Sequence, residues 1–228
     1  MSVALENFGP KVEAHIRYRL ADGTIVPGAT TVIGVLNKPA LVGWANRLGL
    51  QGIDSTKYRD EAAQVGTLAH YLVESHLLGR EPDLDDYTPA QLRRAQHGLD
   101  AFLEWEAGHH YESILAEAPM VSEKFRFAGT IDNLALVDDH LTVLDFKTSG
   151  AVYDEHRIQV SAYRKLAEEN GHKISGVRIL RIPRIETDSL EEHVLSAAQT
   201  DLGWQMFRHC LALYSLQKRM RQGGKSNV

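Results

Sequence analysis

Two carboxylates and one ammonium fall close together in a short stretch of the chain. Residues 129–147 contain two apolar runs joined by the turn Asp138-Asp139-His140, and each run carries one acid, Asp132 or Asp145. Lys147 follows Asp145 by two residues, and side chains two apart on a strand point to the same face. A hairpin would bring Asp132 beside them. This combination is suited to metal-dependent hydrolysis of phosphodiester bonds.

A bound cation would explain why these acids lie within apolar runs. Acidic residues are depleted in strands, and burying an unpaired carboxylate costs several kcal/mol. The alternative is that each acid is a solvated charge at the edge of a strand. We favour the metal site because a divalent ion offsets the cost of burying Asp132 and Asp145.

Three further residues share one face of an expected helix. Gly66, His70 and Glu74 are spaced four apart, and this spacing brings side chains together on a helix. Glycine inside a helix costs about 1 kcal/mol relative to alanine, so Gly66 indicates a close approach by the sheet or a ligand. His70 is a candidate metal ligand, and Glu74 is a candidate for supporting the ligands; the alternatives are an ordinary helix histidine and a surface charge.

Three polar residues near the acids are ambiguous on their own. Gln159 and Tyr163 lie one turn apart on the helix expected after Asp145, where they would otherwise be ordinary helix surface. Glu123, on the strand expected before Asp132, either supports the metal ligands or lies at the surface.

The ordered combination resembles the RecB-like branch of the PD-(D/E)XK nucleases, which includes phage and prophage exonucleases and helicase-linked nuclease domains. Four sequence motifs carry the resemblance, G-x-x-x-H, G-x-x-D, D-x-K and Q-x-x-x-Y, and they are Gly66/His70, Gly129/Asp132, Asp145/Lys147 and Gln159/Tyr163. The resemblance covers about Val65 to Tyr163. Some relatives carry four cysteines for an iron–sulfur cluster, whereas this chain has one cysteine, and the second acid is Asp where the family often has Glu.

The resemblance implies a role for each matched residue. Asp132 and Asp145 would ligate Mg²⁺ or Mn²⁺ together with the carbonyl of Phe146, and His70 would add a nitrogen ligand that favours Mn²⁺. Lys147 would orient the attacking water and stabilise charge on the phosphate. Gln159 and Tyr163 would position the catalytic strand or the nucleic-acid backbone. Whether one ion or two are bound is left open.

The order of elements predicts an α/β fold with a mixed central sheet flanked by helices, and the resemblance implies the PD-(D/E)XK, restriction-endonuclease-like core. We expect a single nuclease domain over 1–221, with a hairpin and mostly helical part at 1–110, a catalytic α/β core at 119–221 and a disordered tail at 222–228. The expected elements are a hairpin at 14–26, helices at 39–49, 58–78, 88–107, 154–170 and 198–220, and strands at 121–127, 131–137, 141–146 and 177–182.

Composition narrows the class of protein. The chain has 228 residues, 43% of them hydrophobic, and a single cysteine, Cys210, which excludes an internal disulfide. We find no signal peptide and no apolar run long enough to span a membrane, so we expect a cytoplasmic protein. A net charge of −5 counts mildly against nucleic-acid binding, but a metallonuclease concentrates carboxylates at its site.

The resemblance therefore implies a Mg²⁺- or Mn²⁺-dependent DNA exonuclease of phage or bacterial recombination and repair. Its substrate would be single-stranded DNA or duplex ends, and a single-strand annealing protein or a helicase is a candidate partner. One alternative is a structure-specific endonuclease. Others are a catalytically silent nucleic-acid-binding module and a nuclease subunit that needs its partner.

Overall fold

A five-stranded mixed sheet forms the centre of the protein in a computed structural model, which describes residues 17–223. The strand order is β1-β2-β3-β4-β5, and β3 and β4 form the parallel pair. The strands are β1 (Tyr111–Ser122), β2 (Phe127–Val137), β3 (His140–Lys147), β4 (Gly176–Arg181) and β5 (Glu191–Val194). Helix α5 (Asp154–Glu169) makes the crossover between β3 and β4, which a parallel connection requires. The predicted α/β class is confirmed.

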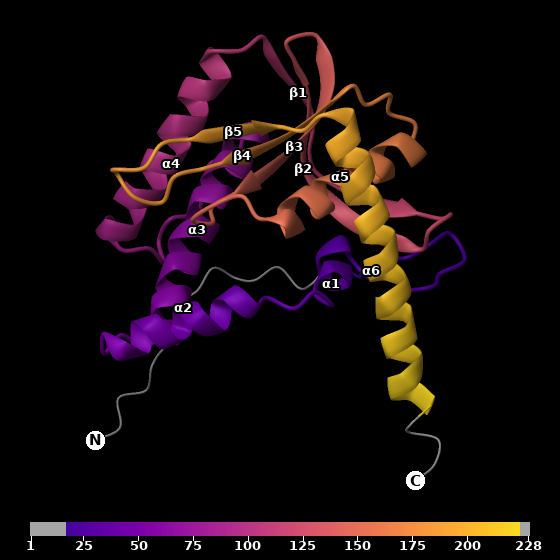
Figure 1. Ribbon diagram of the computed structural model, residues 1–228. Coiled ribbons are helices and arrows are strands. Elements are labelled where there is room, and N and C mark those ends of the chain that lie inside the picture. Colours follow the sequence, from indigo (N-terminus) through magenta and orange to yellow (C-terminus); the bar gives the residue numbers. More distant parts are fainter. Residues whose placement is uncertain (1–16, 224–228) are drawn as a thin grey trace.

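Helices cover both faces of the sheet (Figure 1). Helices α3 (Ser55–Leu77) and α4 (Pro89–Ala107) pack on one face, against Leu144 and Phe146. Helices α1 (Ala29–Ile33), α5 and α6 (Ala197–Gly223) pack on the other, against Val143. Alternate residues of β3 therefore enter different cores, as the pleat of a strand requires. Helix α2 (Pro39–Leu50) buries none of its residues.

The helix boundaries follow their caps. Thr88 and Gln91 form a capping box in front of α4, with Pro89 at its first position, as the sequence predicts. Helix α3 begins earlier than predicted because the Asp54 carboxylate accepts the N–H groups of Thr56 and Lys57. This cap fixes the start of the helix that carries His70.

The predicted strand at 121–127 is wrong. Strand β1 ends at Ser122, a tight turn follows in which Arg126 has a φ of 59°, and β2 begins at Phe127. This strand was expected to begin at residue 121, but Pro119 already lies within β1, opposite Thr130. Because β1 is an edge strand, its proline can turn its missing donor away from β2. The sheet therefore begins at Tyr111.

Some smaller elements differ from expectation or were missed. The sequence did not indicate α1 or β5, and α6 continues through 222–223, which the expected tail included. The N-terminal hairpin is present as a bridge between Arg19 and Ile25, while 14–16 and 224–228 lie outside the described residues. Among residues 17–223, no helix has the length and apolar character needed to cross a membrane. The single-domain organisation stays a prediction.

A buried arginine fastens the connection between β4 and β5. The Arg181 side chain is only 4% exposed, and its guanidinium donates to both carboxylate oxygens of Asp188, at 2.6 and 2.9 Å, and to Glu191 Oε1 at 2.6 Å. Hydrogen bonds from Arg181 lower the pKa of Asp188 and lower that of Glu191 to about 2. Both carboxylates are therefore more easily ionised in the folded protein than in the unfolded chain.

Arg181→Met is expected to lower the free energy of unfolding at pH 7 by roughly 2 kcal/mol, the usual contribution of charged hydrogen bonds. Because the folded-state pKa values are depressed, this stabilisation is present above the ordinary Glu pKa of 4.5 and is lost as pH falls towards 2. Urea titrations of wild type and variant at pH 7 and pH 3 should show the gap shrinking. Arg80→Met, at an exposed position, is the control; an equal gap at both pH values would contradict this account.

Candidate metal centre

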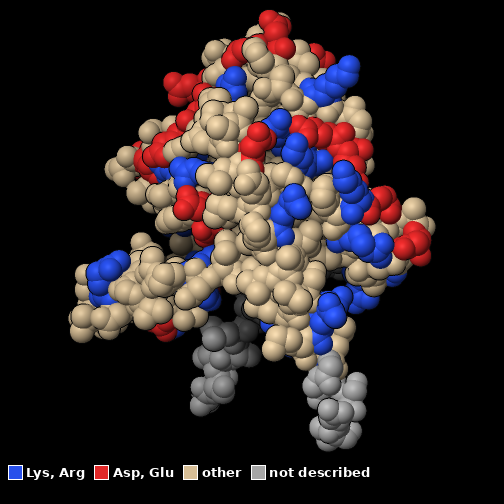
Figure 2. All heavy atoms as spheres, turned by 45° about the vertical axis from the view of Figure 1, so that its right-hand side comes forward, with Lys and Arg blue, Asp and Glu red and all other residues tan. Residues whose placement is uncertain are grey.

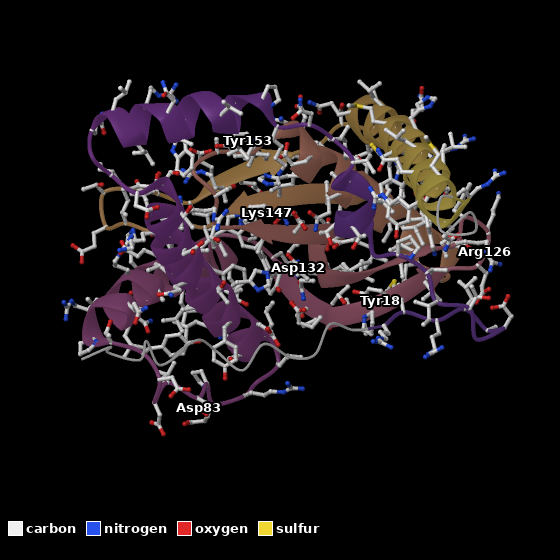
Figure 3. The ribbon with its side chains drawn as sticks, turned by 90° about the horizontal axis from the view of Figure 1, so that it is seen from below. Tyr18, Asp83, Arg126, Asp132, Lys147 and Tyr153 are labelled. Carbon is white, nitrogen blue, oxygen red and sulfur yellow. The ribbon has the colours of Figure 1, made fainter. Side chains whose placement is uncertain are left out.

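The candidate residues gather where strands β2 and β3 separate. Pairing between these strands ends at Asn133 and Leu144, one residue short of Asp132 and Asp145. From there β2 stays paired with β1, while β3 stays paired with β4. Figure 3 views the molecule from below and shows Asp132 and Lys147 near its centre. The sheet thus opens into a fork, and the acids lie on its two arms.

The Asp132 carboxylate bridges the fork. The N–H of Phe146, beyond the end of the β2–β3 ladder, donates to Asp132 Oδ2 at 2.7 Å. His70 Nε2, on α3, lies 3.4 Å from the same oxygen. A helix side chain and a backbone N–H of the neighbouring strand therefore meet at the carboxylate of β2.

His70 and Asp132 stabilise each other's charge. Burial alone would lower the pKa of His70, but the hydrogen bond and charge of Asp132, aided by Glu117, raise it to about 9. Burial likewise opposes ionisation of Asp132, yet His70, Lys147 and the Phe146 N–H hold its pKa below the ordinary value. Without a metal, the pair is an imidazolium and a carboxylate at neutral pH.

Asp145 is fully buried and has one cation beside it. Lys147 Nζ forms an ion pair with Asp145 Oδ2 at 2.7 Å, and among residues 17–223 no other donor reaches this oxygen. Burial raises the pKa of Asp145 to about 6, and the charge of Lys147 opposes that rise. Burial would lower the pKa of Lys147, but Asp145 and Asp132 raise it. Lys147 is therefore an ammonium.

An acid that the sequence did not reveal completes the cluster. Glu117 lies on β1 level with Asp132, because the residues flanking it pair with Asn133 and Ile131. Ligand atoms of His70, Glu117 and Asp132 all lie within 4.8 Å of one another. The prediction missed Glu117 because it began this strand at residue 121; a strand beginning at Tyr111 would have placed Glu117 opposite Asp132.

This donor set fits a divalent cation. Carboxylates and a carbonyl are the oxygen ligands that hard cations prefer, and imidazole adds a nitrogen donor. Asp145 Oδ2 has the Lys147 ammonium beside it at 2.7 Å, yet burial still raises the pKa of Asp145 to about 6, so further positive charge would favour the ionised carboxylate. The residues present therefore suit a metal ion held between the arms of the fork.

The two glycines of the motifs are sites of close approach. A β-carbon at Gly129 would lie 2.5 Å from Cε1 of Tyr163. A β-carbon at Gly66 would collide with the side chain of Thr148, which directly follows Lys147. The close approach expected at Gly66 is confirmed. The residue that comes close is Thr148, at the end of β3. Both glycines let a helix reach the catalytic strands.

Gln159 connects α5 to the buried acid. Its Nε2 lies 3.4 Å from Asp145 Oδ1 and donates to the Tyr163 hydroxyl at 2.9 Å. Burial, with the charges of Asp132 and Asp145, raises the pKa of Tyr163 well above its ordinary value, so the hydroxyl stays protonated. The structure thus brings both motif residues to the acid pair.

Two predicted residues do not join the cluster. Glu123 lies in the turn after β1, where its Oε1 accepts the N–H of Ala21 at 2.7 Å, so it supports the N-terminal hairpin and not the metal ligands. Of the two alternatives left open for Glu123, its exposed position agrees with the surface, because β1 ends before it. Glu74 lies one turn beyond His70 on α3, partly buried, and is outside the group of His70, Glu117 and Asp132.

Several solved structures are similar to this chain at low sequence identity. No curated protein sequence matches the chain. Among solved structures, a putative exonuclease from Eubacterium rectale is similar with 13% identity, a TM-score of 0.46 and 66% of each chain covered. LHK-Exo in complex with dAMP shows 11% identity and a TM-score of 0.42, covering 89% of this chain and 95% of that one. The alkaline exonuclease LHK-Exo from Laribacter hongkongensis shows 12% identity and a TM-score of 0.43, covering 88% and 94%.

The family model of the PD-(D/E)XK nuclease superfamily matches residues 44–223, which include all the residues of the candidate centre. This match extends over most of the sequence, from α2 to the end of α6. The chain belongs to the PD-(D/E)XK nuclease superfamily.

Proposed function

We propose that this nuclease is a Mg²⁺- or Mn²⁺-dependent DNA exonuclease whose catalytic residues are Asp132, Asp145 and Lys147. The observation that carries the proposal is the fork between β2 and β3, where two acids, an ammonium and His70 converge. Action on DNA ends is supported by the ordered motifs shared with the RecB-like branch. The proposed setting is recombination or repair in the cytoplasm of a bacterial or phage-infected cell, with an annealing protein or a helicase as partner.

The proposed ligands of the ion are His70, Asp132, Asp145, the carbonyl of Phe146 and, added by the structure, Glu117. Nucleases of this superfamily use divalent metal ions. Such an ion would polarise the phosphate and make the attacking water more acidic. The Phe146 N–H orients Asp132, so its carboxylate is already directed at the centre before metal or substrate arrives.

Lys147 is proposed to act through its charge. Because its pKa is raised, Nζ keeps its protons and donates hydrogen bonds; it does not accept a proton from water. From its place beside Asp145 Oδ2, Nζ can hold the attacking water and a phosphate oxygen together. A fixed ammonium of this kind stabilises negative charge that develops in the transition state.

Gln159 and Tyr163 are proposed as positioning residues. The Tyr163 hydroxyl accepts one Gln159 N–H and so fixes the amide that faces Asp145 Oδ1. A fixed amide limits rotation of the Asp145 carboxylate, and Oδ2 then stays turned towards Lys147. This pair acts on the reaction through the acid it orients.

Digestion of end-labelled DNA tests the proposed function. Linear and covalently closed circular DNA, each single- and double-stranded, is incubated with Mg²⁺, Mn²⁺ or EDTA. Metal-dependent loss of linear DNA with circles intact is the expected result. Cut circles would indicate an endonuclease. DNA binding without cleavage by the wild-type protein would indicate a silent module or a nuclease that needs its partner.

Lys147→Ala is expected to lower kcat by about 10²- to 10³-fold, since it removes charge that stabilises the transition state. Metal affinity should change far less, because Lys147 is not a ligand. Single-turnover cleavage and Mn²⁺ titration measure the two effects. Lys173→Ala, an exposed lysine just before β4 at the opposite end of the sheet from the fork, is the matched control. Unchanged cleavage by Lys147→Ala would remove this residue from the mechanism.

Glu117→Gln is expected to weaken Mn²⁺ binding by at least about tenfold, because the amide loses the ligand charge while keeping the size of the side chain. Glu123→Gln makes the same chemical change in the turn after β1 and should bind Mn²⁺ as wild type does. Isothermal titration of both variants compares them directly. Equal affinities would show that Glu117 does not reach the ion.

Metal affinity is expected to rise with pH up to about 9. Below that pH, His70 of the metal-free protein carries a proton, because its folded-state pKa is about 9, and the ion must displace it. Mn²⁺ titrations between pH 6.5 and 8.5 in buffers of different ionisation enthalpy would measure the proton released. His70→Asn should abolish most of that release; an unchanged release would assign the proton to another group.

A further inference from the structure

Helix α6 carries two apolar stripes on adjacent faces. The inner stripe is buried or partly buried against α5, α1 and β2, and it contains Phe207, Cys210 and Tyr214. The second stripe, here named the outer stripe, consists of residues that are all exposed. Its members are Leu202, Met206, His209, Leu213, Leu216 and Met220. The five apolar members are between 40% and 79% exposed.

The outer stripe has the spacing of a coiled-coil seam. Its members alternate steps of four and three residues from Leu202 to Met220, the heptad pattern in which one helix packs against another. At 1.5 Å per residue the stripe is about 27 Å long. Continuous apolar surface of this kind on a globular protein marks an interaction site more often than chance exposure.

The charges on α6 select the direction of a partner helix. Lys218, Arg219 and Arg221 lie at its C-terminal end, and Figure 2 shows basic side chains gathered just above the grey C-terminal residues. Asp201 lies at the opposite end of the stripe, beside Leu202. A parallel copy would set these cations against their own counterparts, whereas an antiparallel copy moves them apart and places Arg219 on the same flank as Asp201 of the partner, an acid that also lies 3.3 Å from Arg164 Nη1.

We propose that the protein forms a symmetric dimer in which the outer stripes of two α6 helices pack antiparallel. The heptad seam is then self-complementary: Leu202 meets Met220, Met206 meets Leu216 and His209 meets Leu213 of the second copy. An interface in which one patch meets itself across a two-fold axis closes at two copies. The dimer does not depend on the proposed nuclease activity.

Two features set the strength of this contact. Ala212, on the flank of the seam and close to the two-fold axis, is small enough for the helix backbones to approach. His209 is the polar member, and a polar residue in a seam sets register at a cost in stability. An interface made by one helix of each copy also buries little surface compared with most specific interfaces. Association in the micromolar range is therefore expected.

Sedimentation equilibrium of the full-length protein tests the dimer. Leu213→Glu/Leu216→Glu places two charges in the seam and is expected to weaken dimerisation at least tenfold. Leu41→Glu/Leu50→Glu, the same change at exposed positions of α2, is the matched control and should dimerise as wild type does. A wild-type protein that stays monomeric at about 100 µM would overturn the proposal. So would a seam variant that dimerises normally.

Two further variants test the seam without adding charge. His209→Leu should strengthen dimerisation, because it replaces the polar member; an unchanged or weaker dimer would contradict the seam. In a Cys210→Ala background, His209→Cys mixed with Leu213→Cys should form a disulfide dimer, since those positions face each other. Neither variant should form one alone. Cross-linking of His209→Cys with itself would show a parallel pair and overturn the antiparallel arrangement.

Discussion

The separation of β2 from β3 is the constraint on which the candidate centre depends. Where the ladder stops, the N–H of Phe146 has no backbone acceptor in β2, and the Asp132 carboxylate takes it at 2.7 Å. That single hydrogen bond satisfies a backbone donor and orients a proposed metal ligand. The arms of the fork stay rigid because each remains paired with its outer neighbour, β1 or β4.

Charged side chains are tolerated inside this fork because each acid lies beside a group of opposite charge. His70 lies against Asp132, and Lys147 against Asp145, so no acid is left alone in the apolar interior. The balance is incomplete at Asp145, whose pKa remains raised by burial. The pKa of Asp132 is lowered and that of Asp145 is raised. Buried groups with shifted pKa values of this kind cluster at functional sites.

Much of this arrangement was predictable from the sequence, and the remainder shows where local patterns fail. Gly66, His70, Asp132, Asp145 and Lys147 were found because their spacing reflects the periods of helix and strand. Glu117 was missed because it reaches the centre through its pairing across β1 and β2. The expectation that the first of these strands begins at residue 121 hid that pairing. An edge strand tolerates proline, and no local pattern marks which strand lies at the edge.

The residues of the centre come from α3, β1, β2, β3 and α5, so they are far apart along the chain. In the unfolded chain, bringing these ligands together costs loop-closure entropy. A cation held by these residues would therefore bind the native state more tightly than the unfolded chain. Its concentration enters the folding equilibrium as a mass-action term. The ion would act as a thermodynamic ligand of the fold, and the abundance of folded protein would follow the free metal around it.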